Sequence, residues 1–123
     1  MDQSQLLRGT LDAAVLAVVS ERDGYGYDVL RRLRDAGLTE VADASVYGTL
    51  RRLYKNGSLI TYSVASDEGP HRRYYGINDA GRDQLESARA TWSEFNESFS
   101  RLLGIGSKIG SATGVDLELE MNT

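Results

Sequence analysis

Residues 44–57 limit most strongly what this chain can fold into, because they combine an apolar face with a cationic face. The stretch reads ASVYGTLRRLYKNG. Val46, Leu50 and Leu53 recur at helical spacing, with Tyr54 beside them, and predict a helix that buries this side. The outward or flanking positions are Ser45, Gly48, Thr49, Arg51, Arg52 and Lys55. A helix with such a second face favours a partner that attracts cations.

Two further helices are predicted ahead of this one. The first covers residues 10–22, where Thr10 is a suitable N-cap and apolar residues occupy nearly the whole circumference. The second follows the turn signal at Asp23 and Gly24 and ends at Gly37. Its inward positions are predicted to be Tyr27, Leu30 and Leu33, and its outward positions Arg31, Arg32 and Arg34.

A helix-turn-helix followed by a β-hairpin is predicted from the order of the next segments. Asp43 is a candidate cap for the third helix, over residues 44–56, and Gly57 ends it. Two strands follow at residues 59–66 and 72–77, rich in β-branched and aromatic residues and separated by a turn with Gly69 and Pro70. This order predicts a mainly α fold with a small β-hairpin, the winged form of the helix-turn-helix domain.

A long last helix is predicted from a cap at Asn78 to about Leu103. Along it runs an apolar seam with the heptad steps of a coiled coil. The seam is Leu85, Ala88, Trp92, Phe95, Phe99 and Leu102. We expect it to form a homodimer interface. The chain then divides into a winged helix-turn-helix domain (1–78), a dimerisation helix (79–103) and a flexible Gly/Ser-rich tail (104–123), in which residues 115–121 alternate like a strand.

Composition narrows the function classes. The net charge of −4 argues against a nucleic-acid binder, but residues 8–78 hold 10 Lys and Arg against 9 Asp and Glu, while residues 79–123 hold 4 against 8. The chain has no Cys, and one His, His71, beside Pro70. We therefore expect no metal site, no cofactor and no catalysis, with a hydrolase using His71 as the outlying alternative. Without a long apolar run or a signal-peptide pattern, we expect a cytoplasmic protein.

Five segments in order resemble the PadR family of bacterial transcriptional regulators, over residues 6–103. They are LLRGTLDAAVLAVVSE, GYGYDVLRRLRDAG, SVYGTLRRLYKNGSLI, GPHRRYYGINDAGR and ARATWSEF. The resemblance implies a winged-helix homodimer on an inverted-repeat DNA operator, usually a repressor, whose C-terminal helix packs on the first helix of the partner. It also implies release by a small aromatic or hydrophobic effector. The chain departs from the family at Gly48, where Pro is common, and in its acidic wing tip.

The candidate DNA contacts combine the third helix, the start of the second helix and the hairpin. They are Tyr25, Ser45, Tyr47, Gly48, Thr49, Arg51, Arg52, Lys55, Arg72 and Arg73. Arginine suits guanine edges and hydroxyls suit phosphates. Neighbouring Arg72 and Arg73 are expected on opposite faces of their strand.

Several of these positions have a second interpretation. The cations of the third helix also fit a solvated face, and Tyr47 also fits half-buried packing. Between the tyrosines that flank Gly26, Tyr27 is the expected core residue and Tyr25 the expected phosphate contact. Trp92 fits either the interface core or the wall of an effector pocket between subunits. A winged-helix protein-interaction module without specific DNA binding is the alternative function.

Overall fold

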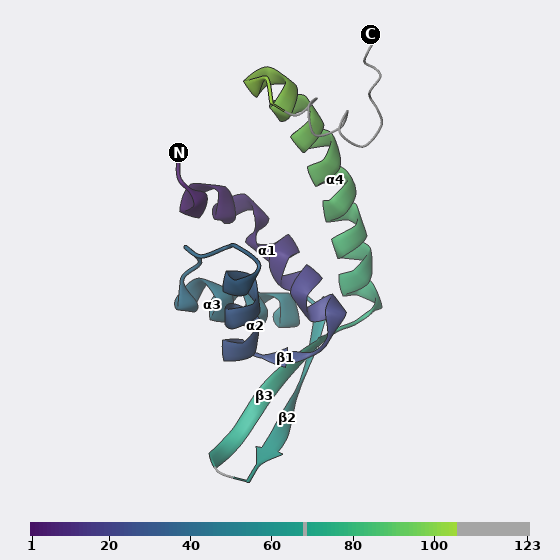
Figure 1. The fold of residues 1–123 in the computed structure, drawn as a ribbon. Helices are drawn as coiled ribbons and strands as arrows, with labels where there is room; N and C mark the ends of the chain where they lie inside the picture. Colours follow the sequence, from purple (N-terminus) through teal and green to yellow (C-terminus); the bar gives the residue numbers. More distant parts are fainter. Residues whose placement is uncertain (68, 106–123) are drawn as a thin grey trace. The chain divides into compact units, whose positions relative to one another are not determined.

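The computed structural model describes residues 1–67 and 69–105. Its elements are α1 (Gln3–Glu21), β1 (Gly24–Tyr25), α2 (Gly26–Asp35), α3 (Asp43–Lys55), β2 (Leu59–Ser66), β3 (Gly69–Ile77) and α4 (Asp79–Leu103). The predicted helix-turn-helix with a hairpin is confirmed, and the β2–β3 hairpin extends away from α1, α2 and α3 (Figure 1). The tail segment at 115–121, expected to alternate like a strand, lies outside the described residues.

Helix α1 begins seven residues before the predicted cap at Thr10, since it starts at Gln3. The sequence signal was a capping box: the Asp2 side chain accepts from the Gln5 backbone N–H at 3.1 Å, and Gln5 Oε1 accepts from the Asp2 N–H at 3.0 Å. Thr10 lies inside the helix, where its hydroxyl donates to the Leu6 carbonyl at 2.9 Å. The prediction of Thr10 as the helix start was wrong.

The sheet has three strands in the order β1–β3–β2, where the sequence predicted two. Gly24 pairs with Tyr75, and Tyr25 with Tyr74, so the expected turn at Asp23 and Gly24 leads into a third strand along β3. Strand β2 has its predicted bounds, whereas β3 begins at Gly69 rather than residue 72. The two-residue β1 fixes the start of α2 at the base of the hairpin.

The core joins α1, α2 and α3 to one face of the sheet. Its fully buried side chains are Val15, Leu16, Val19, Val29, Leu30, Leu33, Val46, Leu50 and Leu53. At the start of α4, Asn78 Oδ1 accepts from the Gly81 N–H at 2.8 Å, which confirms the predicted cap. A Cβ at Gly81 would lie 2.2 Å from the Ser58 carbonyl oxygen, so the backbones meet there and exclude a side chain.

Two compact units meet within α4, between Glu86 and Ser87. Leu85 is 4% exposed and belongs to the core of the first unit, so its expected place on the dimer seam is corrected. In the second unit, Phe95 contacts both Trp92 and Phe99, with ring centroids 5.9 and 5.4 Å apart. Within residues 1–67 and 69–105, no helix is long and apolar enough to cross a membrane.

Candidate nucleic-acid interface

Helix α3 presents a face that the fold leaves uncovered. Ala44, Gly48, Arg51 and Lys55 follow one another at steps of four, three and four residues and therefore share one side of the helix. The opposite side, with Val46, Leu50 and Leu53, is fully buried. We call these four residues the reading face; Gly48 is half-buried and the other three are exposed.

Two cations of the reading face have no partner in the fold. Over the part of the chain that the structure describes, the side chains of Arg51 and Lys55 take part in no ion pair and no hydrogen bond. The Nη2 atom of Arg51 lies 4.0 Å from the point where a Cβ on Gly48 would be. These two cations are therefore available to an external anion.

Arg52, predicted as a possible base contact, is instead bound to helix α1. Its guanidinium donates two hydrogen bonds to the Asp12 carboxylate, at 2.8 and 2.7 Å. The bonds and charge of Arg52 lower the pKa of the Asp12 carboxyl, and Asp12 raises the pKa of Arg52. Both side chains line a groove of about 590 Å³ between α1 and α3 that also takes in Ser45 and Gly48.

Two further expectations for α3 were wrong. Thr49 was expected outward or flanking but is 5% exposed, because it lies on the side of α3 that packs against the core. Tyr54 was expected beside the inward residues but is 47% exposed. Burial of Thr49 removes it from the possible external contacts, and exposure of Tyr54 adds a hydroxyl on the edge of the helix nearest Tyr47.

The start of α2 brings two of the candidate tyrosines close together. Tyr47 packs so closely over Gly26 that a Cβ there would lie 2.6 Å from its ring. Tyr25, the N-cap residue, makes no side-chain cap bond and so leaves the first N–H groups of α2 without this cap. Tyr27, expected in the core, is 57% exposed, and Tyr25 is half-buried. Tyr25, as part of β1, lies on the sheet, and Tyr27 faces solvent. The expected burial of Tyr27 was therefore wrong.

The hairpin carries its two arginines on opposite faces, as predicted. The Arg72 guanidinium lies over the Tyr25 ring, 4.5 Å from its centroid, and so points toward the start of α2. Arg73, on the other face, donates to the Thr61 hydroxyl at 3.3 Å. Arg72 therefore joins Tyr25 and Tyr47 in a group around the α2 N-terminus, whereas Arg73 does not.

A row of tyrosines crosses the sheet beneath Arg72. Tyr25 pairs with Tyr74 and Tyr74 with Tyr62, and their ring centroids lie 5.5 and 5.8 Å apart. Tyr62 donates a short hydrogen bond to the Asp23 carboxylate, and this bond raises the pKa of the Tyr62 phenol. Asp23 also covers Gly76, where a Cβ would lie 2.8 Å from its Oδ1. The row fixes the base of the hairpin to the loop after α1.

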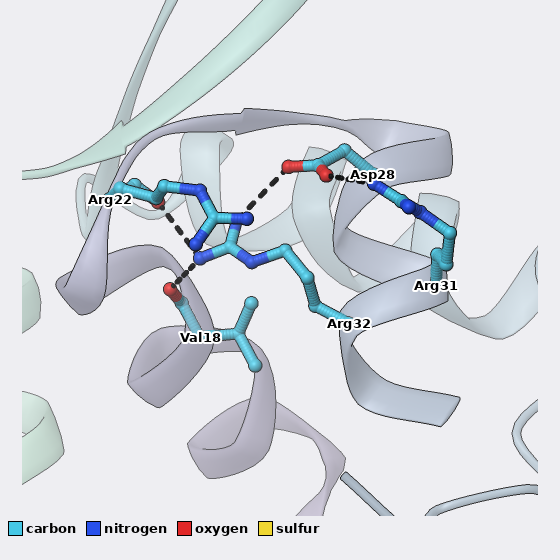
Figure 2. Close-up of polar contacts among 5 residues, drawn as sticks. All are labelled: Val18, Arg22, Asp28, Arg31 and Arg32. Carbon is cyan, nitrogen blue, oxygen red and sulfur yellow. Dashed lines mark hydrogen bonds and ion pairs between the residues drawn. The ribbon is translucent and has the colours of Figure 1, made fainter. Parts of the chain in front are cut away.

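Arg32, whose side chain is largely buried, joins the end of α1 to α2. Arg32 Nη2 donates to the carbonyl oxygens of Val18 and Arg22, at 2.6 and 3.2 Å, and Nη1 donates to Asp28 at 3.1 Å (Figure 2). These carbonyls are at the C-terminal end of α1, where backbone acceptors lack helical partners. Gly24 leaves room for the pair, since its Cβ would lie 2.7 Å from Asp28 Oδ2. Arg32 was predicted outward, and its side chain is only 10% exposed.

The other candidate residues are not part of any metal-binding cluster in the described part of the chain. Residues 1–67 and 69–105 contain no cluster of three or more His, Asp or Glu side chains able to hold a metal ion. His71 is exposed on β3. Ser45 is exposed at the groove edge of α3, and Tyr47 and Gly48 are half-buried. The cations and hydroxyls that the structure gathers are those of α3, the α2 N-terminus and Arg72.

Three helices, a hairpin packed after the third helix and an uncovered cationic face define a winged helix-turn-helix protein. The sequence pattern of the transcriptional regulator PadR-like family matches residues 15–87, and the chain belongs to this family. Members of this family regulate transcription and are not enzymes.

Solved structures show the same fold. A PadR-like transcriptional regulator from Bacillus cereus is 34% identical, with 80% of this chain and 96% of that chain covered and a TM-score of 0.72. A PadR family regulator from Eggerthella lenta is 30% identical over 80% of this chain and 86% of that chain, with a TM-score of 0.73. Bacillus subtilis PadR, solved in complex with operator DNA, is 18% identical over 63% of this chain and 45% of that chain, with a TM-score of 0.58.

Proposed function

We propose that this protein is a homodimeric, sequence-specific repressor that binds an inverted-repeat operator in duplex DNA with α3 in the major groove. The reading face carries this proposal, because it places Arg51 and Lys55 outward with no partner in the described chain. A helix cation that no acid neutralises can bind guanine edges or phosphates. The complex of Bacillus subtilis PadR with operator DNA supports this use of the fold.

The contacts divide by position. Arg51 reads a base edge, since it lies on the reading face and is not held by an acid. Lys55 binds a phosphate as a point charge. Tyr25, Tyr47 and Arg72 surround the uncapped start of α2 and position a second phosphate there. Ser45 contacts the DNA backbone on the groove side of α3, while Arg52 and Arg73 support the fold of the protein.

The homodimer rests on the apolar seam of α4 without Leu85. Trp92 and Phe95 are 51% and 52% exposed, so the seam presents two large aromatic side chains with about half of their surface open to solvent. The other members are Ala88, Phe99 and Leu102. The partner's α1 supplies the surface that receives the seam, where Leu6 is 50% exposed beside Gly9, whose missing Cβ leaves open space. Two copies then present two reading faces to two half-sites.

An aromatic or hydrophobic effector binds between the subunits against Trp92. Its exposed indole is the single Trp of the chain, so its fluorescence reports the site directly. Planar aromatic compounds that quench this fluorescence are expected to lower the affinity of the protein for DNA. Because the two binding equilibria are linked, DNA is expected to lower the affinity for the compound by the same factor. Quenching that leaves DNA affinity unchanged would contradict regulation through Trp92.

The test of the DNA proposal begins with selecting bound fragments from the source genome, including the region upstream of the protein's own gene. Binding to the selected duplex and to a scrambled duplex is then measured at several salt concentrations. We expect an inverted repeat of two half-sites, tighter binding of the selected duplex, and affinity that falls steeply with salt. Equal, weak binding to both duplexes would support the alternative, a winged-helix protein-interaction module.

A further inference from the structure

Gly48 lies in the interior of α3, where glycine is the least favourable residue after proline. At several other positions glycine is required because a side chain would clash with its neighbours, as at Gly26 beneath Tyr47 and Gly81 against Ser58. Gly48 has none: a Cβ there would meet only the tip of Arg51, at 4.0 Å. Its position has no packing requirement that an alanine would violate.

The missing side chain leaves a notch on the reading face, bounded by Ala44, one turn earlier, and Arg51, one turn later. The backbone N–H and C=O groups of a helix interior are bonded within the helix, so the floor of the notch offers only C–H groups. Ala44 adds a methyl group, Ser45 a hydroxyl at the rim, and Arg52 lies on the flank, bound to Asp12. The floor of the notch is therefore apolar, with the Ser45 hydroxyl and the free Arg51 guanidinium at its edges.

We propose that this notch receives the methyl group of a thymine next to the base pair that Arg51 contacts. Thymine is the base that carries a methyl group on its major-groove edge, whereas the other exposed groups there are hydrogen-bond donors and acceptors. A surface of C–H groups has no partner to offer them. The inference rests on the proposed function, and it makes Gly48 a specificity-determining residue that lowers helix stability in favour of contact with DNA.

The test combines one protein variant with one change in DNA. Each thymine of one selected half-site is replaced in turn by deoxyuridine, which removes only the methyl group. At one position we expect wild-type affinity to fall about four-fold, the effect of one buried methyl group. The Gly48→Ala variant fills the notch, so we expect it to bind the thymine operator more than about five-fold less tightly and to lose the preference for thymine over deoxyuridine.

Thermal unfolding provides the control for folding. Since alanine favours a helix interior and meets no obstacle at residue 48, Gly48→Ala is expected to unfold about 4 °C higher than wild type. A variant that is more stable yet binds its operator less tightly cannot be explained by misfolding. Lys55→Ala serves as the matched control on the same face, with weaker binding but an unchanged thymine preference.

Three results would overturn the proposal while the DNA-binding function stands: a selected half-site without thymine, no response of wild type to deoxyuridine at any position, or an unchanged thymine preference in Gly48→Ala. Failure of the proposed function looks different, because wild type would then bind the selected and scrambled duplexes equally.

Discussion

Arg52 on α3 is bound to Asp12 on α1 through both ends of its guanidinium, at 2.8 and 2.7 Å. The neighbouring Arg51 has no such partner within the described chain. Two adjacent arginines that look equivalent in sequence therefore differ in their contacts: Arg52 connects two helices, and the Arg51 side chain is left without a partner. Because the pair joins α3 to α1, we propose that it also sets the angle at which the reading face would meet the major groove of DNA.

Replacing Asp12 by Asn is expected to destabilise the fold slightly. Both side chains are largely exposed, so the loss is about 0–1 kcal/mol near neutral pH. Because Arg52 lowers the pKa of Asp12 in the folded state, the contribution is complete above the ordinary aspartate pKa, about 3.9, and is lost as the pH falls through the lower folded value. Urea unfolding of wild type and variant at several pH values measures this difference.

This pH dependence would be contradicted if the stability difference between wild type and Asp12→Asn stayed the same at acid pH, where both proteins carry an uncharged group at residue 12. Asp43→Asn is the matched control, since Asp43 pairs with Arg34 at 2.8 Å but does not contact Arg52. Both variants remove one exposed pair, and only Asp12→Asn is expected to change DNA affinity through the placement of α3.

Truncation of Arg32 is expected to destabilise the protein by about 3 kcal/mol or more. Arg32→Ala removes the donor to the carbonyls of Val18 in α1 and of Arg22 just after it. The change also leaves Asp28, whose side chain is 13% exposed, with fewer partners (Figure 2). Arg31→Ala is the control, because Arg31 pairs with the same carboxylate but its side chain is 57% exposed, and a loss below about 1 kcal/mol is expected. Equal losses in denaturant unfolding would refute the special role of Arg32.

A carboxylate on the apolar seam is expected to break the dimer. Phe95→Asp would bury an unpaired charge at the proposed contact and shift the protein toward monomer in sedimentation. Ala90→Asp adds the same charge to the same helix away from the seam and is expected to leave the dimer intact. A wild type that sediments as a monomer at micromolar concentration would remove the homodimer and, with it, the palindromic operator.

Tyr62 is expected to ionise at higher pH than an ordinary tyrosine, since its hydrogen bond to Asp23 raises its pKa. The stabilisation of the hairpin base is present below the ordinary tyrosine pKa of about 10 and is lost as the pH rises through the raised value. NMR titration of the tyrosine rings measures this. Asp23→Ala is expected to move the Tyr62 titration to lower pH, and identical titrations in both proteins would contradict the hydrogen bond.

Much of the fold could be predicted because its signals are local. The repeat of Val46, Leu50 and Leu53 located α3, and the β-branched and aromatic run over residues 59–66 located β2 with its observed bounds. Strand β1 could not be predicted, because two residues have no periodicity and are a strand only through pairing with β3. Leu85 fits the heptad pattern, but the pattern cannot show that the first turns of α4 pack on the core.

Side-chain roles were harder to predict, because they depend on partners distant in sequence. A helical wheel places Arg32 outward as a charged residue, yet α1 carbonyls and Asp28 allow its burial. The same reasoning could not separate Arg51 from Arg52, because Asp12 is 40 residues from Arg52 in sequence. The reading face itself was predictable, since it follows from the burial of the opposite side of α3.

The most direct test of the account measures operator affinity for Arg51→Ala and Arg52→Ala against operators with each base pair of the half-site changed in turn. We predict that Arg51→Ala loses about 1–3 kcal/mol on the selected operator and no longer discriminates at one symmetric position. Arg52→Ala is predicted to weaken binding while keeping the full base preference. Unchanged discrimination in Arg51→Ala at every position would contradict the claim that α3 reads sequence through its uncovered face.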